Sequence, residues 1–420
     1  MSARAMLTVP RRPALRVSAR PYARTYDIRV PFVAIAGLSA RLFTESAGRA
    51  RLNVAALDLF GDRDTRQRAK VWLDIGGAGL SVDRDKLFDA LARAARLPRM
   101  LGLIAGGGLE PFARELHERP GLPRFIGNDL RAIAAVREPR RFFALLDALG
   151  IAYPEVTYTR PTDSRGWIGK HADGCGGTHI RAASDTDAAV PSPDYFQRVA
   201  AGRSMSALFI AAGGHAMTVG FAEQLSVAYG ALPFVHAGSL GPIDLPPPVA
   251  SRIDGMVREI VAKTGLTGMN SIDFLLDDDT VSVLEINPRP SSTAALHELA
   301  SPAAWPHGLL ACHIDACVKG RLPQPTGTAP QRCIAQRVAF APHGFTVTQH
   351  VSDTLFAAPW CRDVPQPGVR IAAGEPVCTL IATAAAPALL TDELERQRAR
   401  LIELIDTCHE SHDDLTTRTG

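Results

Sequence analysis

Three oxygen-bearing side chains in two short apolar segments are the residues best suited to do chemistry. Asp273 lies in the first segment, and Glu285 and Asn287 lie in the second. Alternate side chains of a strand share one face, so Glu285 and Asn287 point the same way. If the two segments form a hairpin with a loop at residues 278–280, Asp273 lies directly opposite Glu285. Oxygen donors clustered in this way suit Mg²⁺, so we interpret all three as metal ligands.

A solvated hairpin is the alternative explanation for these polar residues. It accounts for the acidic residues 277–279, which we assign to an exposed turn. It fits the three donors poorly, because apolar residues flank each of them. Pro288 and Pro290 end the second segment and hold Arg289 beside the same site. An arginine there suits an anionic phosphate or acyl phosphate.

A lone lysine and a glycine-rich loop mark a second candidate site. Lysine and arginine together number 46, yet lysine occurs only at positions 70, 86, 170, 263 and 319. Lys170 ends an apolar segment and is followed by Gly174, Gly176 and Gly177. An ammonium group on an apolar strand and the backbone N–H groups of a glycine turn can both contact phosphate. A flexible turn would explain the glycines alone, but Lys170 and the downstream donors favour a phosphate site.

The first third of the chain alternates short apolar segments with helical patterns. This alternation predicts an α/β domain over residues 27–150, with a parallel sheet covered by helices. Gly150 and Pro154 end its last helix. The predicted strands are 30–37, 52–59 and 100–105, and the predicted helices are 39–50, 83–96 and 140–149.

Strands predominate after residue 150, which indicates an α+β domain over residues 151–325. Proline and glycine at 323–327 mark a linker. Residues 326–420 are expected to form a small β module with a closing helix at 392–409. The predicted strands of the middle domain are 166–171, 207–212 and 215–223 and the hairpin around Asp273 and Glu285, with helices at 248–264 and 303–319.

Composition excludes several classes of protein. A net charge of +3 and an aromatic content of 6% argue against a nucleic-acid binder. No apolar run reaches 18 residues, which argues against a membrane span. Seven scattered cysteines without a CxxC pair suit free thiols in a reducing cytoplasm. Residues 1–26 are basic and contain no acid, so we expect a disordered arm, with a transit peptide as the alternative.

The motif Asp273-Phe274 followed by Glu285-Ile286-Asn287-Pro288-Arg289 resembles the ATP-grasp superfamily of carboxylate–amine ligases. The segment 167–177 is similar to that family's strand lysine and mobile glycine loop. The segment 194–202 is similar to its hinge, whose backbone pairs with the adenine edge. The resemblance spans about residues 30 to 390. It implies a Rossmann-like pre-ATP-grasp domain, a two-lobed ATP-grasp domain and a C-terminal β module.

The resemblance also implies cofactors and roles. ATP would bind with two Mg²⁺ ions, for which Mn²⁺ can substitute; Glu285 would bridge the ions, Asp273 would hold one and Asn287 the other. Lys170 and Arg140 would offset phosphate charge, and Arg289 would steady the transferred group, so Lys170 and Arg289 are the implied catalytic residues. The implied nucleotide-binding residues are Lys170, Arg140, Gly174, Gly176, Gly177, Gln197, Arg198, Val199 and Glu223.

The sequence departs from the family pattern at several positions. The family commonly has a basic residue just before the central domain, and here the candidates are Arg137 and Arg140, of which we choose Arg140. The family often has an acid where Gln197 stands. Glu223 could serve the ribose or the metal, and a solvated strand end explains it equally well.

The implied reaction joins a small-molecule carboxylate to an amine, such as the amino acid glutamate, through an acyl phosphate. A nucleotide-binding regulator without ligase activity is the alternative function. Carboxylation is a third use of the acyl phosphate, although the chain has no Met-Lys-Met-type biotinyl site. No nucleic-acid or membrane partner is expected. A homodimer is the assembly that the family suggests.

Overall fold

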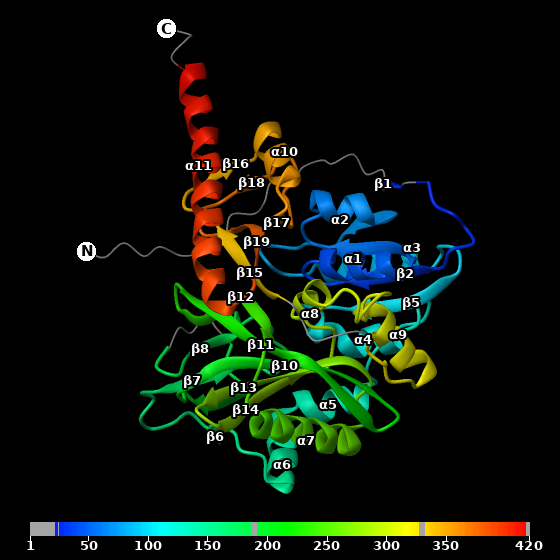
Figure 1. The fold of residues 1–420 in the computed structure, drawn as a ribbon, viewed down its shortest axis with the longest axis vertical. Helices are drawn as coiled ribbons and strands as arrows, with labels where there is room; N and C mark the ends of the chain where they lie inside the picture. Colours follow the sequence, from blue (N-terminus) through cyan, green and yellow to red (C-terminus); the bar gives the residue numbers. More distant parts are fainter. Residues whose placement is uncertain (1–21, 24, 186–190, 327–331, 417–420) are drawn as a thin grey trace.

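The computed structural model describes residues 22–23, 25–185, 191–326 and 332–416 (Figure 1). Most of the expected basic arm lies outside these residues. Tyr22–Ala23, however, form strand β1, which pairs antiparallel with β4 (Val71–Asp74). The expectation of disorder through residue 26 is therefore wrong for these two residues, because their backbone extends the edge of the first sheet.

The N-terminal domain is built on a five-stranded sheet in the order β1-β4-β3-β2-β5. The strands β2 to β5 are parallel, as predicted. Every residue of β2 is buried: Val33 and Ile35 pack into one apolar cluster and Phe32 and Ala34 into another. The elements are β2 (Phe32–Ala36), α1 (Arg41–Arg49), β3 (Asn53–Asp58), α2 (Arg63–Arg68), α3 (Arg84–Ala94), β5 (Met100–Ala105), a 3₁₀ turn (Glu110–Phe112) and α4 (Ala113–Glu118).

Strand order reverses at β2, which has β3 on one side and β5 on the other. At such a switch point the loops after neighbouring parallel strands diverge and leave a crevice at the carboxyl edge of the sheet. The loops after β2 and β5 meet here, where the Leu38 N–H donates to the Gly107 oxygen at 3.0 Å. The glycine loop 106–108 is thereby held at the edge of the domain that faces the rest of the molecule.

Two helices, α5 (Leu130–Arg137) and α6 (Pro139–Leu149), lead from this domain into the next. Pro139 starts α6, and Gly150 ends it in the left-handed conformation with φ of 65°. This is the helix end that the sequence predicts, because glycine adopts a positive φ without steric cost.

The central region contains two antiparallel sheets. The smaller one has the order β6-β9-β7-β8, and the larger one contains eight strands. The smaller sheet consists of β6 (Val156–Thr157), β7 (Trp167–Lys170), β8 (Ile180–Ala182) and β9 (Tyr195–Arg198). The larger sheet includes β10 (Arg203–Ala212), β11 (His215–Tyr229), β12 (Leu232–Ile243), β13 (Gly268–Asp277) and β14 (Thr280–Asn287), and α7 (Pro247–Thr264) packs against it.

The C-terminal β elements continue this larger sheet. Strand β15 (Cys333–Phe340) pairs with β12, and β19 (Pro376–Ala384) and β17 (Cys361–Arg362) follow it in the strand order. The expected boundary at residue 325 therefore does not separate two sheets. The remaining elements are β16 (Phe345–Thr346), α10 (Gln349–Ala357), β18 (Arg370–Ile371), a 3₁₀ turn (Pro387–Leu389) and the long α11 (Leu390–Thr416), which projects away from the body (Figure 1).

One predicted helix is shorter than expected. The expected helix over 303–319 begins only at Leu309, as α9 (Leu309–Lys319), because Pro302, Pro306 and Gly308 interrupt the preceding chain. An additional helix, α8 (Ala294–Ala300), directly follows the β14 loop.

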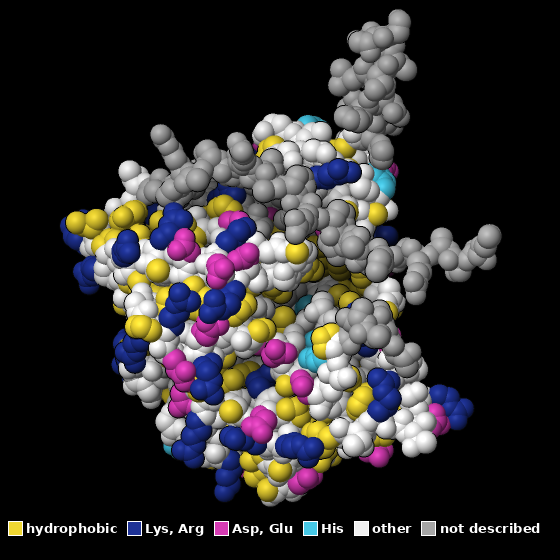
Figure 2. All heavy atoms as spheres, turned by 180° about the vertical axis from the view of Figure 1, so that it is seen from behind, with side chains coloured by type: hydrophobic (Ala, Val, Ile, Leu, Met, Phe, Trp, Pro, Cys, Tyr) yellow, Lys and Arg dark blue, Asp and Glu magenta, His cyan; other side chains and the backbone are white. Residues whose placement is uncertain are grey.

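Charge is distributed evenly over the surface shown in Figure 2, where basic and acidic side chains lie interspersed. This distribution agrees with the small net charge of +3. Among the described residues, no helix is both long enough and apolar enough to cross a membrane.

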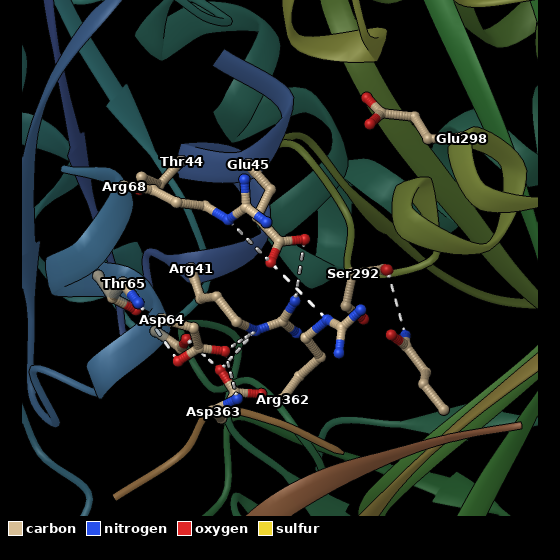
Figure 3. Close-up of polar contacts among 12 residues, drawn as sticks. Arg41, Thr44, Glu45, Asp64, Thr65, Arg68, Ser292, Glu298, Arg362 and Asp363 are labelled. Carbon is tan, nitrogen blue, oxygen red and sulfur yellow. Dashed lines mark hydrogen bonds and ion pairs between the residues drawn. The ribbon is translucent and has the colours of Figure 1, made fainter. Parts of the chain in front are cut away.

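A buried charge cluster joins the N-terminal domain to the C-terminal strands (Figure 3). Arg41 of α1 contacts Asp363, which follows β17, with Nε 2.8 Å from Oδ1. Its guanidinium also lies 3.8 Å from Asp64 and 3.5 Å from Glu45. The N-terminal domain and the C-terminal strands are thus held together by paired charges in the interior.

Candidate active site

The β13–β14 hairpin pairs Asp273 with Glu285, as the sequence predicts. The route to this register differs from the expected three-residue loop. Asp277 pairs with Thr280 across a two-residue turn, and an irregularity then inserts Leu284 between the paired positions. The turn is one residue shorter than expected and the bulge adds one residue, so the two deviations cancel.

The two carboxylates and the amide lie within hydrogen-bond range of one another. The amide nitrogen of Asn287 donates to Asp273 at 3.0 Å and to Glu285 at 3.4 Å. Ser206, opposite Asp273 on β10, donates its hydroxyl to the same carboxylate at 2.7 Å. Three neighbouring strands therefore contribute to one polar cluster.

The two carboxylates have opposite electrostatic environments. Burial and the neighbouring charge of Glu285 raise the pKa of Asp273 to about 6, although Ser206 and Gln224 hydrogen-bond to it. Burial would raise the pKa of Glu285 as well, but Lys170 and Arg137 outweigh burial and lower it to about 2. Paired titratable groups whose environments shift their pKa values apart are typical of functional sites.

Two cations face Glu285 from outside the hairpin. Lys170 Nζ and Arg137 Nη1 each lie 3.9 Å from Glu285 Oε2. Lys170 is only 3% exposed. Burial opposes its charge, but Tyr195 and Glu285 raise the pKa of its ammonium group above the ordinary value. The lone lysine of β7 therefore stays charged in the interior, next to the candidate metal ligands.

Arg289 occupies the other side of the cluster and is held by the N-terminal domain. Its Nε donates to Glu110 at 2.7 Å, and its Nη2 donates to the Asn287 oxygen at 3.3 Å. The N–H of Gly108 donates to the second Glu110 oxygen at 2.7 Å. A side chain at Gly107 would lie 3.3 Å from the guanidinium carbon, so glycine permits this close approach.

The glycine loop between β7 and β8 spans the opening of the site. Arg137 Nη2 donates to the Gly174 oxygen at 2.8 Å, and the N–H of His236 donates to the Gly176 oxygen at 3.0 Å. Gly177 has φ of 74°, and a side chain there would lie 1.7 Å from the Phe234 oxygen. The loop is therefore seated on β12 and linked to α5.

The hinge segment after β9 connects the two sheets. Gln197 is 1% exposed and accepts from Lys170 at 3.3 Å, whereas its amide nitrogen is buried without a partner among the described residues. The N–H groups of Arg198 and Val199 donate to Glu155 and Gly166, both at 2.8 Å. These two N–H groups therefore have partners within the protein, and the adenine contact of the hinge backbone stays a prediction.

A cavity of about 730 Å³ lies between the two sheets and contains these groups in its wall. It reaches from the hinge to the first turn of α11. The wall includes Lys170, Gly176, Gly177, Gln197, Arg198, Val199, Gln224, Asp273, Glu285, Asn287 and Arg289.

Residues 140–293 match the family model of the ATP-grasp domain. The chain contains an ATP-grasp domain. A relative of 22% identity is an uncharacterized protein of Methanocaldococcus jannaschii, matched over 83% of this chain and 87% of the relative. The match to the domain covers the strand lysine, the hinge and the three oxygen donors.

Solved structures extend the likeness beyond the ATP-grasp domain to most of the chain. Biotin carboxylase of Campylobacter jejuni has a TM-score of 0.64 at 14% identity, covering 87% of this chain and 90% of its own. An N5-carboxyaminoimidazole synthase of Aspergillus clavatus has 0.63 at 12%, covering 90% and 100%. An L-amino acid ligase of Bacillus licheniformis has 0.62 at 14%, covering 89% and 97%. The mixed α/β architecture is thus the fold of these proteins.

The donors of the ATP-grasp domain fit a divalent cation in type and position. Two carboxylates and one amide oxygen are hard ligands. The amide nitrogen of Asn287 currently faces the carboxylates, and a 180° rotation of the amide would bring its oxygen to them instead. Gln197 Nε2 and Arg137 Nε are buried donors without partners among the described residues, and both suit an anionic or polar ligand in the cleft.

Two predicted residues of the ATP-grasp site lie elsewhere. Arg140 is exposed and stacks 4.0 Å from the ring centroid of Tyr158, whereas Arg137 contacts both Glu285 and the glycine loop. The structure therefore places Arg137, and not the chosen Arg140, next to the candidate metal ligands. Pro139 starts a new helix between them, so the two side chains leave from different axes.

Glu223 is the second correction. It pairs with Arg203 at 3.3 Å and lies in the middle of β11, whose strand continues to Tyr229. Among the described residues that line the large cavity, Gln224 is present and Glu223 is not. Neighbouring residues of a strand face opposite sides, so Gln224 takes the place expected for Glu223.

Burial disfavours charge on one thiol and two imidazole groups near the ATP-grasp site. Burial raises the pKa of the Cys175 thiol to about 11. Burial lowers the pKa of His179, and it lowers that of His297 to about 4. No thiolate is therefore poised as a nucleophile at Cys175.

Proposed function

We propose that this protein is an ATP- and Mg²⁺-dependent ligase that activates a carboxylate as an acyl phosphate and joins it to an amine. The observation that carries the proposal is the position of Glu285. It lies beside Asp273 and Asn287 on one side and 3.9 Å from both Lys170 and Arg137 on the other. The proposed metal ligands and Lys170 thus lie together in the wall of a cavity large enough for a nucleotide, and Arg137 contacts Glu285 beside that wall.

Each group has a role in this proposal. Asp273, Glu285 and Asn287 would hold Mg²⁺, which supplies charge neutralisation between the phosphates of ATP. Lys170 and Arg137 would neutralise the phosphate oxygens next to the leaving ADP. Arg289, fixed by Glu110, would orient the transferred phosphoryl group and the incoming carboxylate.

The chemistry proceeds in two displacements. An oxygen of the substrate carboxylate attacks the γ-phosphorus, and the bond between that phosphorus and the ADP oxygen breaks. The amine nitrogen then attacks the carbonyl carbon of the acyl phosphate, the carbon–oxygen bond to phosphate breaks, and the nitrogen loses a proton. The products are an amide, ADP and inorganic phosphate. An amino acid such as glutamate is our choice for the amine.

The glycine loop excludes water from the reacting atoms in this proposal. It is seated on β12 through Gly176 and linked to α5 through Gly174. Closure over the nucleotide would protect the acyl phosphate from hydrolysis.

Oxygen transfer tests the proposal directly. The full-length protein is incubated with ATP, Mg²⁺, pooled amines and pooled carboxylic acids labelled with ¹⁸O in both carboxyl oxygens. One ¹⁸O should appear in inorganic phosphate and the other in the amide, because the acyl phosphate passes one carboxyl oxygen to phosphate. The matched control is Asp273→Asn, which keeps the size of the side chain and should release no labelled phosphate.

Two results would reject the proposal. ATP binding without ADP release under any pair of substrates would support the regulatory alternative. Unlabelled phosphate accompanied by a new amide would show that the carboxylate is activated by another route.

A further inference from the structure

A second cavity lies behind the candidate active site, on the side of the N-terminal domain. Its volume is about 240 Å³. It is a half-open pocket lined by the loop after β5, by α4 and α5 and by the chain that leaves β14. It is separate from the large cavity, but Arg289 lines both.

The wall of this second cavity is apolar over most of its extent. A dry cavity of about 150 Å³ lined by aliphatic and aromatic side chains is sufficient to bind benzene. This cavity is larger, so it can hold a substituted aromatic ring or a branched aliphatic chain. The apolar lining residues are Ala105, Leu109, Ala113, Leu116, Phe125, Ile126, Ile133, Pro288 and Pro290.

Charge is concentrated at the wall that faces the active site. Arg137 and Arg289 line the second cavity there, and Arg137 also lies 3.9 Å from Glu285 of the large cavity. Glu110 lines the same wall, but both of its oxygens already accept hydrogen bonds, from Arg289 and from the Gly108 N–H. The guanidinium groups are therefore the charges that an entering anion would meet.

We infer that this cavity binds the acyl group of the carboxylate substrate, and that the substrate is a monocarboxylic acid with a compact apolar body. This inference rests on the proposed function. The apolar body would fill the space among α4, α5 and Pro290, and the carboxylate would lie at Arg289. From that position it faces the cluster of Asp273, Glu285 and Asn287, where the γ-phosphate is proposed to lie.

Other substrate classes suit this lining less well. A second carboxylate, a phosphate or a sugar would be buried among aliphatic side chains without hydrogen-bond partners, which is unfavourable. An amine would carry positive charge toward two guanidinium groups. Asp173 and Glu138, the remaining acidic residues of the lining, are exposed. Glu138 is also paired with Arg141, 2.5 Å away.

The test is a binding measurement that does not require turnover. Phenylacetate, 3-methylbutanoate and succinate are titrated by calorimetry into the full-length protein with Mg²⁺ and a non-hydrolysable ATP analogue. Transfer of an aromatic body from water to an apolar cavity favours binding, so phenylacetate should bind at least about tenfold more tightly than succinate.

Two substitutions in the cavity should act in opposite directions. Ala113→Phe, on α4, fills the space and should weaken phenylacetate binding at least about tenfold. Ile133→Ala, on α5, enlarges the space and should shift the preference toward bulkier apolar acids. Ala399→Phe introduces the same ring on an exposed position of α11 and should leave binding unchanged.

The outcomes separate this inference from the proposed function. Apolar acids that bind to the wild type and lose affinity in Ala113→Phe support the cavity assignment, even if no carboxylate promotes ADP release. Equal binding of phenylacetate and succinate, or unchanged binding in Ala113→Phe, overturns it. Failure of every apolar acid to bind, with ADP release promoted only by polar acids, also overturns it while leaving the ligase proposal intact.

Discussion

Charge compensation around Glu285 dominates the site at the scale of single residues. Glu285 lies beside two cations, whereas Asp273 has a hydroxyl and two amide groups as neighbours and a second carboxylate opposite. The surplus negative charge at Asp273 is unfavourable for folding, and a divalent cation would remove this cost. A site of this kind sacrifices stability for function.

Asp273→Asn should therefore stabilise the protein in the absence of metal. The folded carboxyl has a pKa of about 6, against 3.8 for the ordinary group, so the folded state binds its proton more tightly. The stability of the wild type should fall as the pH rises from about 4 to about 6, by about 1–2 kcal/mol after allowance for partial exposure. Asparagine does not titrate, so its advantage should be present at pH 7 and absent at pH 4.

Urea unfolding in EDTA at the two pH values measures this difference. Ser206→Ala is a useful companion variant, because it removes a hydrogen bond to Asp273 and should raise the carboxyl pKa further. A lower free energy of unfolding for Asp273→Asn than for the wild type at pH 7 would contradict the account.

The two arginines before the central domain provide a matched pair. Arg137→Met should weaken binding of the Mg²⁺ complex of ATP at least about tenfold, because it removes a half-buried cation that we propose lies beside the phosphates. Arg140→Met should have an effect below about threefold, since Arg140 is exposed and stacks on Tyr158. Calorimetric titration of each variant distinguishes the two. A larger loss in Arg140→Met would restore the original sequence-based choice.

The alternation of side chains along a strand explains which of the site residues could be predicted from the sequence. Glu285 and Asn287 are two positions apart on a regular strand, and Pro288 fixes where that strand ends, so their common face follows from the sequence. Glu223 was misplaced because β11 runs further than expected and its pairing has irregularities, which change the face of each residue. The register shifts between β11 and β12 cannot be predicted from the residue types of the two strands.

In the proposed mechanism, closure of the site depends on the glycine loop between β7 and β8. Two hydrogen bonds attach the loop to its neighbours. The Gly174 oxygen accepts from Arg137 of α5, and the Gly176 oxygen accepts from the His236 N–H of β12. Gly176 and Gly177 both have positive φ, but only Gly177 packs against β12. This contrast separates the effect of backbone strain from the effect of steric contact.

Gly177→Ala should lower ATP affinity more than Gly176→Ala. A Cβ at 177 would lie 1.7 Å from the Phe234 oxygen and must displace the loop, whereas nothing lies within 4 Å of a Cβ at 176. Each substitution also adds about 1 kcal/mol of left-handed strain. We expect at least about a tenfold loss for Gly177→Ala and below about tenfold for Gly176→Ala, measured by calorimetry. Equal losses would show that contact with β12 is unimportant.

Strands β2, β3 and β5, helices α1, α3 and α6 and the central hairpin could be predicted from apolar periodicity, whereas β4, α2, α4 and α5 were not. The continuation of the larger sheet into β15, β19 and β17 could not, because pairing between β12 and β15 depends on contacts between residues about 100 positions apart. The linker at 323–327 suggested a separate module, although the proline-rich chain only returns to the same sheet.

At the scale of the whole molecule, ion pairs connect the N-terminal domain to the C-terminal elements. Arg41 links α1 to Asp363 beyond β17, and Arg63 of α2 contacts Asp353 of α10 at 2.6 Å. Figure 3 shows the guanidinium groups of Arg41 and Arg362 beside the carboxylate of Glu45. These contacts hold the N-terminal domain, which carries the glycine loop 106–108, against the C-terminal elements.

Arg41→Met should destabilise the protein by about 3–5 kcal/mol at pH 7, because buried carboxylates lose their counter-ion. Burial and the neighbouring Asp363 raise the pKa of Asp64 to about 6, so the loss should shrink at pH 5, where this group takes up a proton. Arg114→Met removes an exposed pair with Glu118 and should change stability by less than about 1 kcal/mol. Urea unfolding of both variants at the two pH values tests this. A loss equal to that of the control would contradict the account.

The magnesium dependence of nucleotide binding tests the central claim most directly. A non-hydrolysable ATP analogue is titrated into the wild type and into Glu285→Ala, each in Mg²⁺ and in EDTA. For the wild type, affinity should be at least about tenfold higher in Mg²⁺, and for Glu285→Ala the two affinities should be equal, because the variant has lost the carboxylate that faces both metal and cations. A wild type indifferent to Mg²⁺, or a variant that keeps the full enhancement, would contradict the assignment of these donors to a metal–nucleotide site.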